Sequence, residues 1–159
     1  MVDTLNDLDN VVYEISGDTP ASSREWQYHM INYLKNYQAT KPKQHQVGMS
    51  YVYLGNTNDL FVSPADWILL PGANTDPPLA AGTKVILSDM DPKLLGTTSY
   101  PMVWESFMRG FNPIYLESDL AKLSADENVL GSMGYALKYS QLVDLSAMCL
   151  MINYFEKLH

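Results

Sequence analysis

The chain has 159 residues, 47% of them apolar, and a formal net charge of −8 at pH 7. This composition allows one packed core, but no apolar run approaches the roughly 18 residues that a membrane span requires. The acidic balance argues against nucleic acids and anionic membranes as partners, because the sequence offers no basic patch that would bind either of them.

The N-terminal segment combines a short helix with the first strand. Residues 1–9 are acidic where a signal peptide would be basic and then apolar, so we expect a cytoplasmic protein. Residues 2–8 are predicted to form the end of a short helix. The apolar stretch 11–15 predicts a buried strand that runs directly into the polar turn Ser16-Gly17-Asp18.

The rest of the chain alternates between apolar segments of strand length and segments with helical spacing. Strands are predicted at 46–53, 66–70, 84–88 and 113–116, helices at 22–39, 100–109 and 126–142, a short turn at 59–62 and a loop at 71–82. Ser22 with Glu25, and Ser124 with Glu127, have the spacing of capping boxes at the starts of two helices. The helix at 22–39 carries apolar residues at helical spacing, which predict its buried face: Trp26, Met30, Tyr33, Leu34 and Tyr37.

About five strands alternating with helices predict an α/β fold with a parallel sheet and right-handed crossovers. An open doubly wound sheet and part of a (β/α)8 barrel both fit this pattern. The open sheet usually has a glycine-rich phosphate turn after its first strand, but residues 16–20, Ser-Gly-Asp-Thr-Pro, match no such motif. A barrel presents carboxylates at the C-terminal ends of its strands, as Asp18, Asp89 and Glu117 do here. We therefore favour the partial barrel and expect no nucleotide cofactor.

A series of segments, taken in order, resembles strands four to eight and their helices in the cellulase-like (β/α)8-barrel glycoside hydrolases. The segments are Asn10-Val-Val-Tyr-Glu-Ile-Ser, Ser23-Arg-Glu-Trp-Gln-Tyr-His-Met-Ile, Lys41-Pro-Lys-Gln-His, Val47-Gly-Met, Ser63-Pro-Ala-Asp-Trp, Lys84-Val-Ile-Leu-Ser-Asp-Met-Asp, Trp104-Glu-Ser-Phe-Met-Arg-Gly-Phe-Asn-Pro-Ile-Tyr and Met133-Gly-Tyr-Ala-Leu-Lys-Tyr. The resemblance implies a half TIM barrel as one domain over 1–148, without strands one to three. Residues 149–159 do not resemble the family, whose members are often exported, and are expected to form an altered tail.

The resemblance also implies a carboxylate pair for glycoside hydrolysis. In the family the acid/base is a glutamate directly after an asparagine at the end of strand four, and Gly17-Asp18 stands at that place here. The nucleophile follows strand seven, which corresponds to Asp89 or Asp91. Retaining hydrolysis places the two carboxyl groups about 5–5.5 Å apart and inverting hydrolysis about 6.5–9.5 Å apart. Asp18 is one methylene shorter than glutamate, and a displacement of about 1 Å can cost a factor of about 100 in rate, so weak catalysis is expected.

Each candidate also has a structural interpretation. Asp18 precedes a helix and can serve as a turn or cap residue, while Asp89 or Asp91 can satisfy loop amides. Glu14 interrupts an apolar strand and is expected to be a hydrogen-bond hub inside the barrel or a substrate contact. Glu117 follows the last strand and is either a loop residue or a substrate contact at the rim.

The remaining aromatic and metal-ligating residues are assigned mainly to the core. Trp26, Trp67 and Trp104 are expected to be core residues, although Trp67 also fits a platform for a sugar ring. His29 lies among the core positions of its helix. The spacing of the histidines matches no metal site and Cys149 lacks the framework of a nucleophile, so no metal or other cofactor is expected.

Two functions stay open at this point. The first is a half-barrel without efficient catalysis that binds carbohydrate or serves in assembly, and the second is an active glycoside hydrolase that uses Asp18 with Asp89 or Asp91. About five barrel strands would leave two unpaired edges and an exposed apolar face, which favours association into a homodimer. In the alternative, the apolar tail segment Leu150-Met-Ile-Asn-Tyr-Phe folds over that face.

Overall fold

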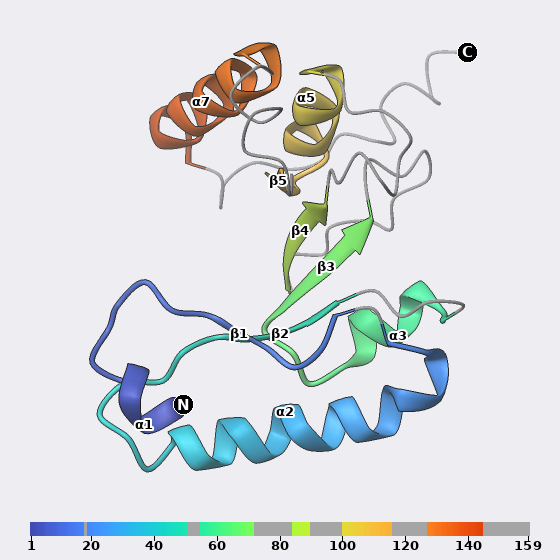
Figure 1. Cartoon of the computed structure of the whole chain (residues 1–159). Helices are drawn as coiled ribbons and strands as arrows, with labels where there is room; N and C mark the ends of the chain where they lie inside the picture. The colour runs from blue at the N-terminus through green and yellow to red at the C-terminus, as the bar shows by residue number, and fades with distance from the viewer. Residues whose placement is uncertain (18, 51–54, 72–83, 90–99, 116–126, 145–159) are drawn as a thin grey trace. The chain divides into compact units, whose positions relative to one another are not determined.

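The computed structural model describes residues 1–17, 19–50, 55–71, 84–89, 100–115 and 127–144. Five parallel strands form one sheet in the order β1-β2-β3-β4-β5, with helices flanking it, so the predicted α/β fold is confirmed (Figure 1). The strands are β1 (Tyr13–Glu14), β2 (Val47–Ser50), β3 (Trp67–Pro71), β4 (Val85–Asp89) and β5 (Asn112–Ile114). The helices are α1 (Val2–Leu5), the 3-10 helix η1 (Ala21–Ser23), α2 (Arg24–Gln38), α3 (Thr57–Val62), α5 (Tyr100–Met108) and α7 (Glu127–Leu142).

The order of the strands distinguishes between the two architectures that fit the sequence pattern. Each described strand lies beside its neighbour in sequence, as consecutive strands of a (β/α)8 barrel do. A doubly wound sheet instead reverses its strand order at a switch point near the first strand. The described sheet has no such reversal and is consistent with the predicted partial barrel.

Two local predictions before and after α2 are wrong. The segment 59–62, expected as a turn, belongs to the helix α3, because the side chain of Asn56 caps that helix by accepting a hydrogen bond from the amide of Asn58 at 2.9 Å. The Ser22–Glu25 capping box does not form. Ser23 is the N-cap of α2, and its hydroxyl donates to a carbonyl of the preceding 3-10 turn at 2.7 Å instead.

The chain divides into two compact units. The first comprises Met1–Leu70 with Gly82–Leu87, and the second comprises Pro71–Ala81 with Ser88–His159. Among the described residues, no helix is long and apolar enough to span a membrane. The expected tail at 149–159 and Ser124, of the second expected capping box, lie outside the described residues.

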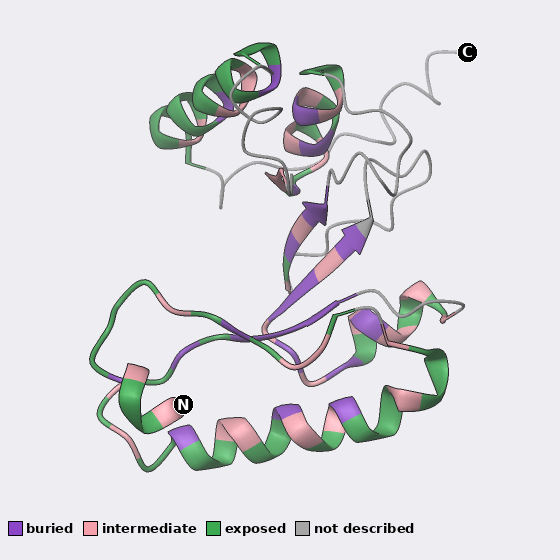
Figure 2. Ribbon diagram, in the orientation of Figure 1, coloured by how far each residue is buried: buried purple, intermediate pink, exposed green. Residues whose placement is uncertain are grey.

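In the first unit, helix α2 packs against strand β2. The register aligns Tyr13 with Val47, and Gly48 with Trp67, so alternate residues of neighbouring strands share a face of the sheet. The face of the sheet toward α2 is apolar and fully buried, and it is formed by Val47, Met49 and Ile68. Ile31 of the helix is also fully buried. Figure 2 shows the buried positions of α2 on the side nearest the strands. The opposite face holds Glu14, Gly48, Ser50, Trp67 and Leu69, whereas Tyr13 shares the face of Val47.

The buried face of α2 differs from the predicted one by about one residue. The helix buries Gln27, Ile31 and Gln38, whereas Trp26 and His29 are exposed, so their expected core positions are wrong. One of the inward glutamines, Gln38, satisfies buried backbone groups that would otherwise be unpaired. Gln38 donates from Nε2 to the His45 carbonyl at 3.1 Å and accepts from the His45 amide at 2.7 Å. Hydrophobic periodicity does not detect such a face, because two of its members are amides.

The core of the second unit is formed by α5 and α7. Its buried centre and the partly buried residues packed against it are Val103, Val129 and Ala136 with Met102, Trp104, Phe107, Tyr115 and Met133. Ser106 of α5 donates to Ser88 of β4 over 3.0 Å between the two Oγ atoms, and both side chains are fully buried. Gly110 follows α5 with a φ of 78°, a backbone conformation that favours glycine, and the Phe111 amide donates to the Ser106 carbonyl at 2.9 Å.

Gly48→Ala should destabilise the first unit, because the new methyl group would overlap the indole ring of Trp67. Overpacking of this kind costs about 1–3 kcal/mol, which chemical denaturation followed by circular dichroism can measure. Gly17→Ala is the matched control, because no atom lies within 4 Å of a Cβ placed at that position. Equal stability of the two variants would contradict the packing of Trp67 over Gly48.

Candidate functional site

The structure describes three of the predicted site residues, each at an end of a strand. Glu14 ends β1, Trp67 begins β3, and Asp89 ends β4, where it is 8% exposed. The other three lie outside the described residues: Asp18, Asp91 and Glu117. The separation of the predicted catalytic carboxylates therefore stays a prediction.

Glu14 and Ser50 lie at the carboxyl ends of two adjacent parallel strands, the edge at which α/β proteins bind their ligands. The hydroxyl of Ser50 donates a hydrogen bond to Oε1 of Glu14. Ser50 is 5% exposed, whereas Glu14 is exposed. A buried hydroxyl therefore orients a carboxylate that solvent can reach.

Trp67 completes this face of the sheet. Glu14, Gly48 and Trp67 form one row across β1, β2 and β3, and the indole occupies the volume that any side chain on Gly48 would need. Trp67 is 5% exposed, and its Nε1 atom is buried without a hydrogen-bond partner. With so little exposure, the indole ring lies buried against Gly48 rather than open to solvent. We call Glu14, Gly48, Ser50 and Trp67 the strand-face site.

The chemistry of the strand-face site suits a neutral ligand that carries hydroxyl groups. The carboxylate accepts hydrogen bonds, and a serine hydroxyl can both donate and accept them. None of the four residues is basic, so an anionic ligand would meet only the charge of Glu14. Within the described ranges, no group of three or more His, Cys, Asp or Glu side chains is arranged to hold a metal ion.

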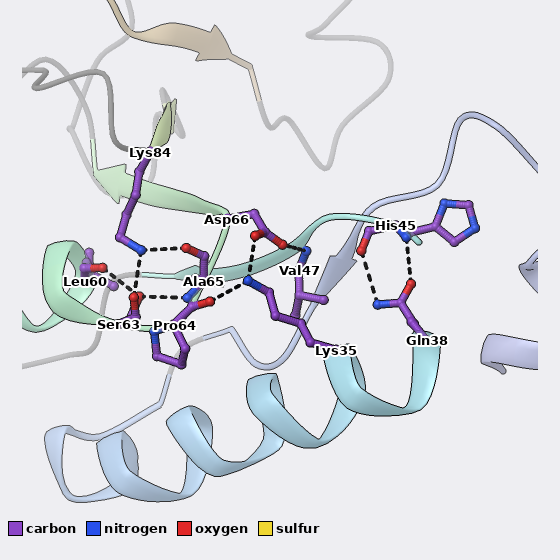
Figure 3. Close-up of polar contacts among 10 residues, drawn as sticks. All are labelled: Lys35, Gln38, His45, Val47, Leu60, Ser63, Pro64, Ala65, Asp66 and Lys84. Carbon is purple, nitrogen blue, oxygen red and sulfur yellow. Dashed lines mark hydrogen bonds and ion pairs between the residues drawn. The ribbon is translucent and has the colours of Figure 1, made fainter. Parts of the chain in front are cut away.

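At the amino-terminal edge of the same strands, one carboxylate joins three elements (Figure 3). Oδ1 of Asp66 pairs with Nζ of Lys35 at 2.5 Å, and Oδ2 accepts a hydrogen bond from the Val47 amide at 2.9 Å. Lys35 also donates to the Pro64 carbonyl at 2.7 Å. Asp66 thereby ties α2 to the starts of β2 and β3.

Lys84, directly before β4, binds the loop that leads into β3 (Figure 3). Its Nζ donates to the carbonyl oxygens of Ser63 at 2.7 Å and Ala65 at 2.5 Å. Burial lowers the pKa of Lys84, the charge of Lys35 lowers it further, and Asp66 opposes both effects. Because both lysines are occupied by backbone carbonyls, we interpret this cluster as a support for the sheet.

Sequence patterns did not reveal the cluster of Lys35, Asp66 and Lys84. Its hydrogen bonds join residues that lie 19 to 31 positions apart in the chain. These residues belong to no motif, and only the fold brings them together. The one available signal was a charged residue directly before each of two apolar strands, Asp66 before β3 and Lys84 before β4.

His45 is a packing residue at the same edge of the sheet. It is buried, lies edge-on to Tyr13 with 5.6 Å between ring centroids, and places Nε2 3.3 Å from the Asn6 carbonyl. The Asn6 side chain in turn exchanges two hydrogen bonds with the backbone of Lys43, at 2.7 and 3.3 Å. These contacts attach the N-terminal segment to the loop before β2.

Comparison with known proteins finds no matching family model, curated protein or solved structure. The chemistry of the strand-face site is therefore the structural basis for a functional proposal. The fold alone does not decide the function, because β/α folds carry many unrelated activities.

Asp66→Ala should lower the free energy of unfolding by about 1–3 kcal/mol, because it removes the carboxylate that accepts from the Val47 amide and pairs with the Lys35 ammonium. Glu25→Ala is the control, because Glu25 is also ion-paired, with Arg24, but on the exposed surface. Such surface pairs contribute about 0–1 kcal/mol. Urea denaturation measures the free energy of unfolding of both variants. Equal losses of stability would contradict the supporting role of Asp66.

Acid should loosen the N-terminal segment. Hydrogen bonds from Lys41 and Tyr37 lower the pKa of Asp3, and a hydrogen bond from Lys43 lowers the pKa of Asp9. A carboxyl group whose pKa is lower in the folded than in the unfolded protein stabilises the fold above the unfolded value, and this contribution is lost as the pH falls through the folded value. We therefore expect the protection of the α1 amides from hydrogen exchange to fall as the pH drops below 3.8, the ordinary value.

Substitutions that remove the charges of Asp3 and Asp9 provide the control for the effect of acid on the N-terminal segment. The double variant Asp3→Asn with Asp9→Asn should show weak protection of α1 already at pH 7. Asp7→Asn, which changes a neighbouring exposed carboxylate, should keep the protection of the unmodified chain. Protection that is the same in all three proteins at pH 7 would rule out the two ion pairs as the attachment.

Proposed function

We propose that the chain is a carbohydrate-binding β/α domain of the glycoside-hydrolase type with little or no hydrolytic activity. The observation that supports this proposal is the buried Ser50 hydroxyl that holds the exposed Glu14 carboxylate at the carboxyl edge of two parallel strands. Sugars present neighbouring hydroxyl groups, and a fixed carboxylate accepts strong hydrogen bonds from them. The resemblance to glycoside hydrolases points to the same class of ligand.

The weak activity follows from the residues at the predicted acid/base position. Hydrolysis of a glycosidic bond requires two carboxyl groups at a defined separation. Asp18 is one methylene shorter than the glutamate of the family pattern, and Gly17 lacks the amide side chain that precedes that glutamate. Loss of both features leaves a site that can bind a sugar more readily than it can protonate a leaving group.

A second candidate function is active glycoside hydrolysis by Asp18 with Asp89 or Asp91. The observation that favours it is the position of Asp89, which ends β4 and is 8% exposed. In the family pattern this strand end carries the nucleophile. A buried carboxylate at such a strand end is a suitable place for one, because the surrounding protein restrains it.

Isothermal titration calorimetry with a panel of soluble oligosaccharides tests carbohydrate binding. Glu14→Gln keeps the size of the side chain and removes its charge, so we expect the dissociation constant to rise about ten- to hundredfold. Glu25→Gln, which changes an exposed carboxylate on α2, should leave the affinity unchanged. The proposal fails if no oligosaccharide binds, or if both variants bind as the unmodified chain does.

Release of the chromophore from aryl glycosides tests hydrolysis. We expect no turnover above the uncatalysed rate for the unmodified chain. Turnover that Asp18→Asn abolishes, while Glu14→Gln retains it, would establish the second candidate function in place of the first. The binding experiment and the hydrolysis experiment are independent, because calorimetry measures binding without turnover.

A further inference from the structure

Trp67 carries an unpaired hydrogen-bond donor inside the strand-face site. Its Nε1 atom is buried without a hydrogen-bond partner, and the residue as a whole is 5% exposed. Tryptophan N–H groups in protein interiors usually find a partner, and proteins leave few buried polar groups unpaired because each one destabilises the fold. An unpaired donor in a candidate binding site is therefore a group that an oxygen of a ligand can satisfy.

The packing of the indole on Gly48 shows where this donor lies. Trp67 pairs with Gly48 across β2 and β3, and a Cβ atom at Gly48 would be 2.0 Å from Cε2 of the indole, the ring atom to which Nε1 is bonded. The ring therefore leans from β3 over β2, which is the strand next to β1. A side chain at position 48 would occupy the same volume, so only glycine there leaves room for this edge of the indole.

Glu14 leans over β2 from the other side. Its carboxylate accepts from the hydroxyl of Ser50, which lies two residues beyond Gly48 on the same face of the strand. At about 3.3 Å per residue, positions 48 and 50 are about 7 Å apart. The indole donor and the carboxylate acceptor therefore meet over one short stretch of β2, with a gap of about that size between them.

We propose that the strand-face site binds two adjacent hydroxyl groups of one sugar ring, one of which accepts from Nε1 of Trp67 while the other donates to Glu14. The inference rests on the proposed carbohydrate function and narrows its ligand to a neutral sugar with an unsubstituted vicinal diol. Each hydrogen bond is about 2.7–3.0 Å long, so two of them with the diol between them span a gap of this size. Because Nε1 is covered in the free chain, the indole shifts as the diol enters.

A platform on which a sugar ring stacks is the alternative role for Trp67. Stacking needs an open ring face, and an indole that is 5% exposed and packed on Gly48 does not offer one. An anionic ligand would also accept from the N–H group, but the carboxylate of Glu14 on the same face would repel it. The ring edge and the carboxylate together favour a ligand that donates and accepts without a charge, as a diol does.

Nuclear magnetic resonance of the indole N–H groups tests this assignment on the full chain. The chain has three tryptophans, and the signal of Trp67 is identified by its nuclear Overhauser contact with Gly48. The probes are the tetrasaccharides of glucose, xylose and mannose. With each probe that binds, we expect the Trp67 signal to move downfield as its proton becomes hydrogen-bonded. The signals of Trp26, exposed on α2, and Trp104, in the second unit, should stay in place.

Calorimetry with the same tetrasaccharides gives a second measurement. Trp67→Phe removes the donor and keeps an aromatic ring against Gly48, so the dissociation constant should rise about tenfold, as expected for the loss of one neutral hydrogen bond. Trp104→Phe is the matched control, because it changes a packing residue of the second unit, and it should leave the affinity unchanged. Circular dichroism verifies that both variants are folded.

The outcomes separate this inference from the function on which it rests. A tetrasaccharide that binds without moving the Trp67 signal, or that binds Trp67→Phe as tightly as the unmodified chain, would overturn the role of the indole donor and leave the carbohydrate function standing. Absence of binding by all three tetrasaccharides would count against the carbohydrate function itself, and the inference would fall with it.

Discussion

The carboxylate of Asp66 is the contact on which the arrangement of the first unit depends. One oxygen binds Lys35 of α2 and the other binds the amide at the start of β2, while the residue itself leads into β3. Strands of a parallel sheet begin in different loops, so their mutual register needs a fixed point at that edge. The bond from Asp66 to the Val47 amide lies directly before the position where Gly48 pairs with Trp67, and Gly48 in turn pairs with Glu14.

The sequence predicted the sheet well where strands are continuous and apolar. The run at 84–88 matches β4 to within one residue, because its continuous apolar centre, Val85-Ile86-Leu87, leaves a clear strand signal. Strand β1 is shorter than its apolar stretch, since only Tyr13 and Glu14 are in the ladder with β2. Glu14, expected inside the barrel, is exposed in the structure, and the Ser50 hydroxyl donates a hydrogen bond to its carboxylate.

The sequence did not predict which side of α2 is buried. Two inward positions are glutamines, and the aromatic residues that dominate the apolar pattern lie on the exposed flank. The polar cluster around Asp66 was missed for a related reason. Hydrogen bonds from side chains to the backbone of distant loops leave no signal in local periodicity, because in the sequence each charged residue of the pair resembles an ordinary surface residue.

The pair of hydrogen bonds between Gln38 and His45 has a consequence for the evolution of the connection between α2 and β2. The two residues are seven positions apart, and the side chain of the first closes the intervening loop by bonding both backbone groups of the second. Loops usually tolerate inserted residues at small entropic cost. This loop is a ring of defined circumference, so an added or deleted residue would separate the glutamine from its partner and leave a buried amide unpaired. Variation in length is expected elsewhere in the chain, and this turn should keep its length.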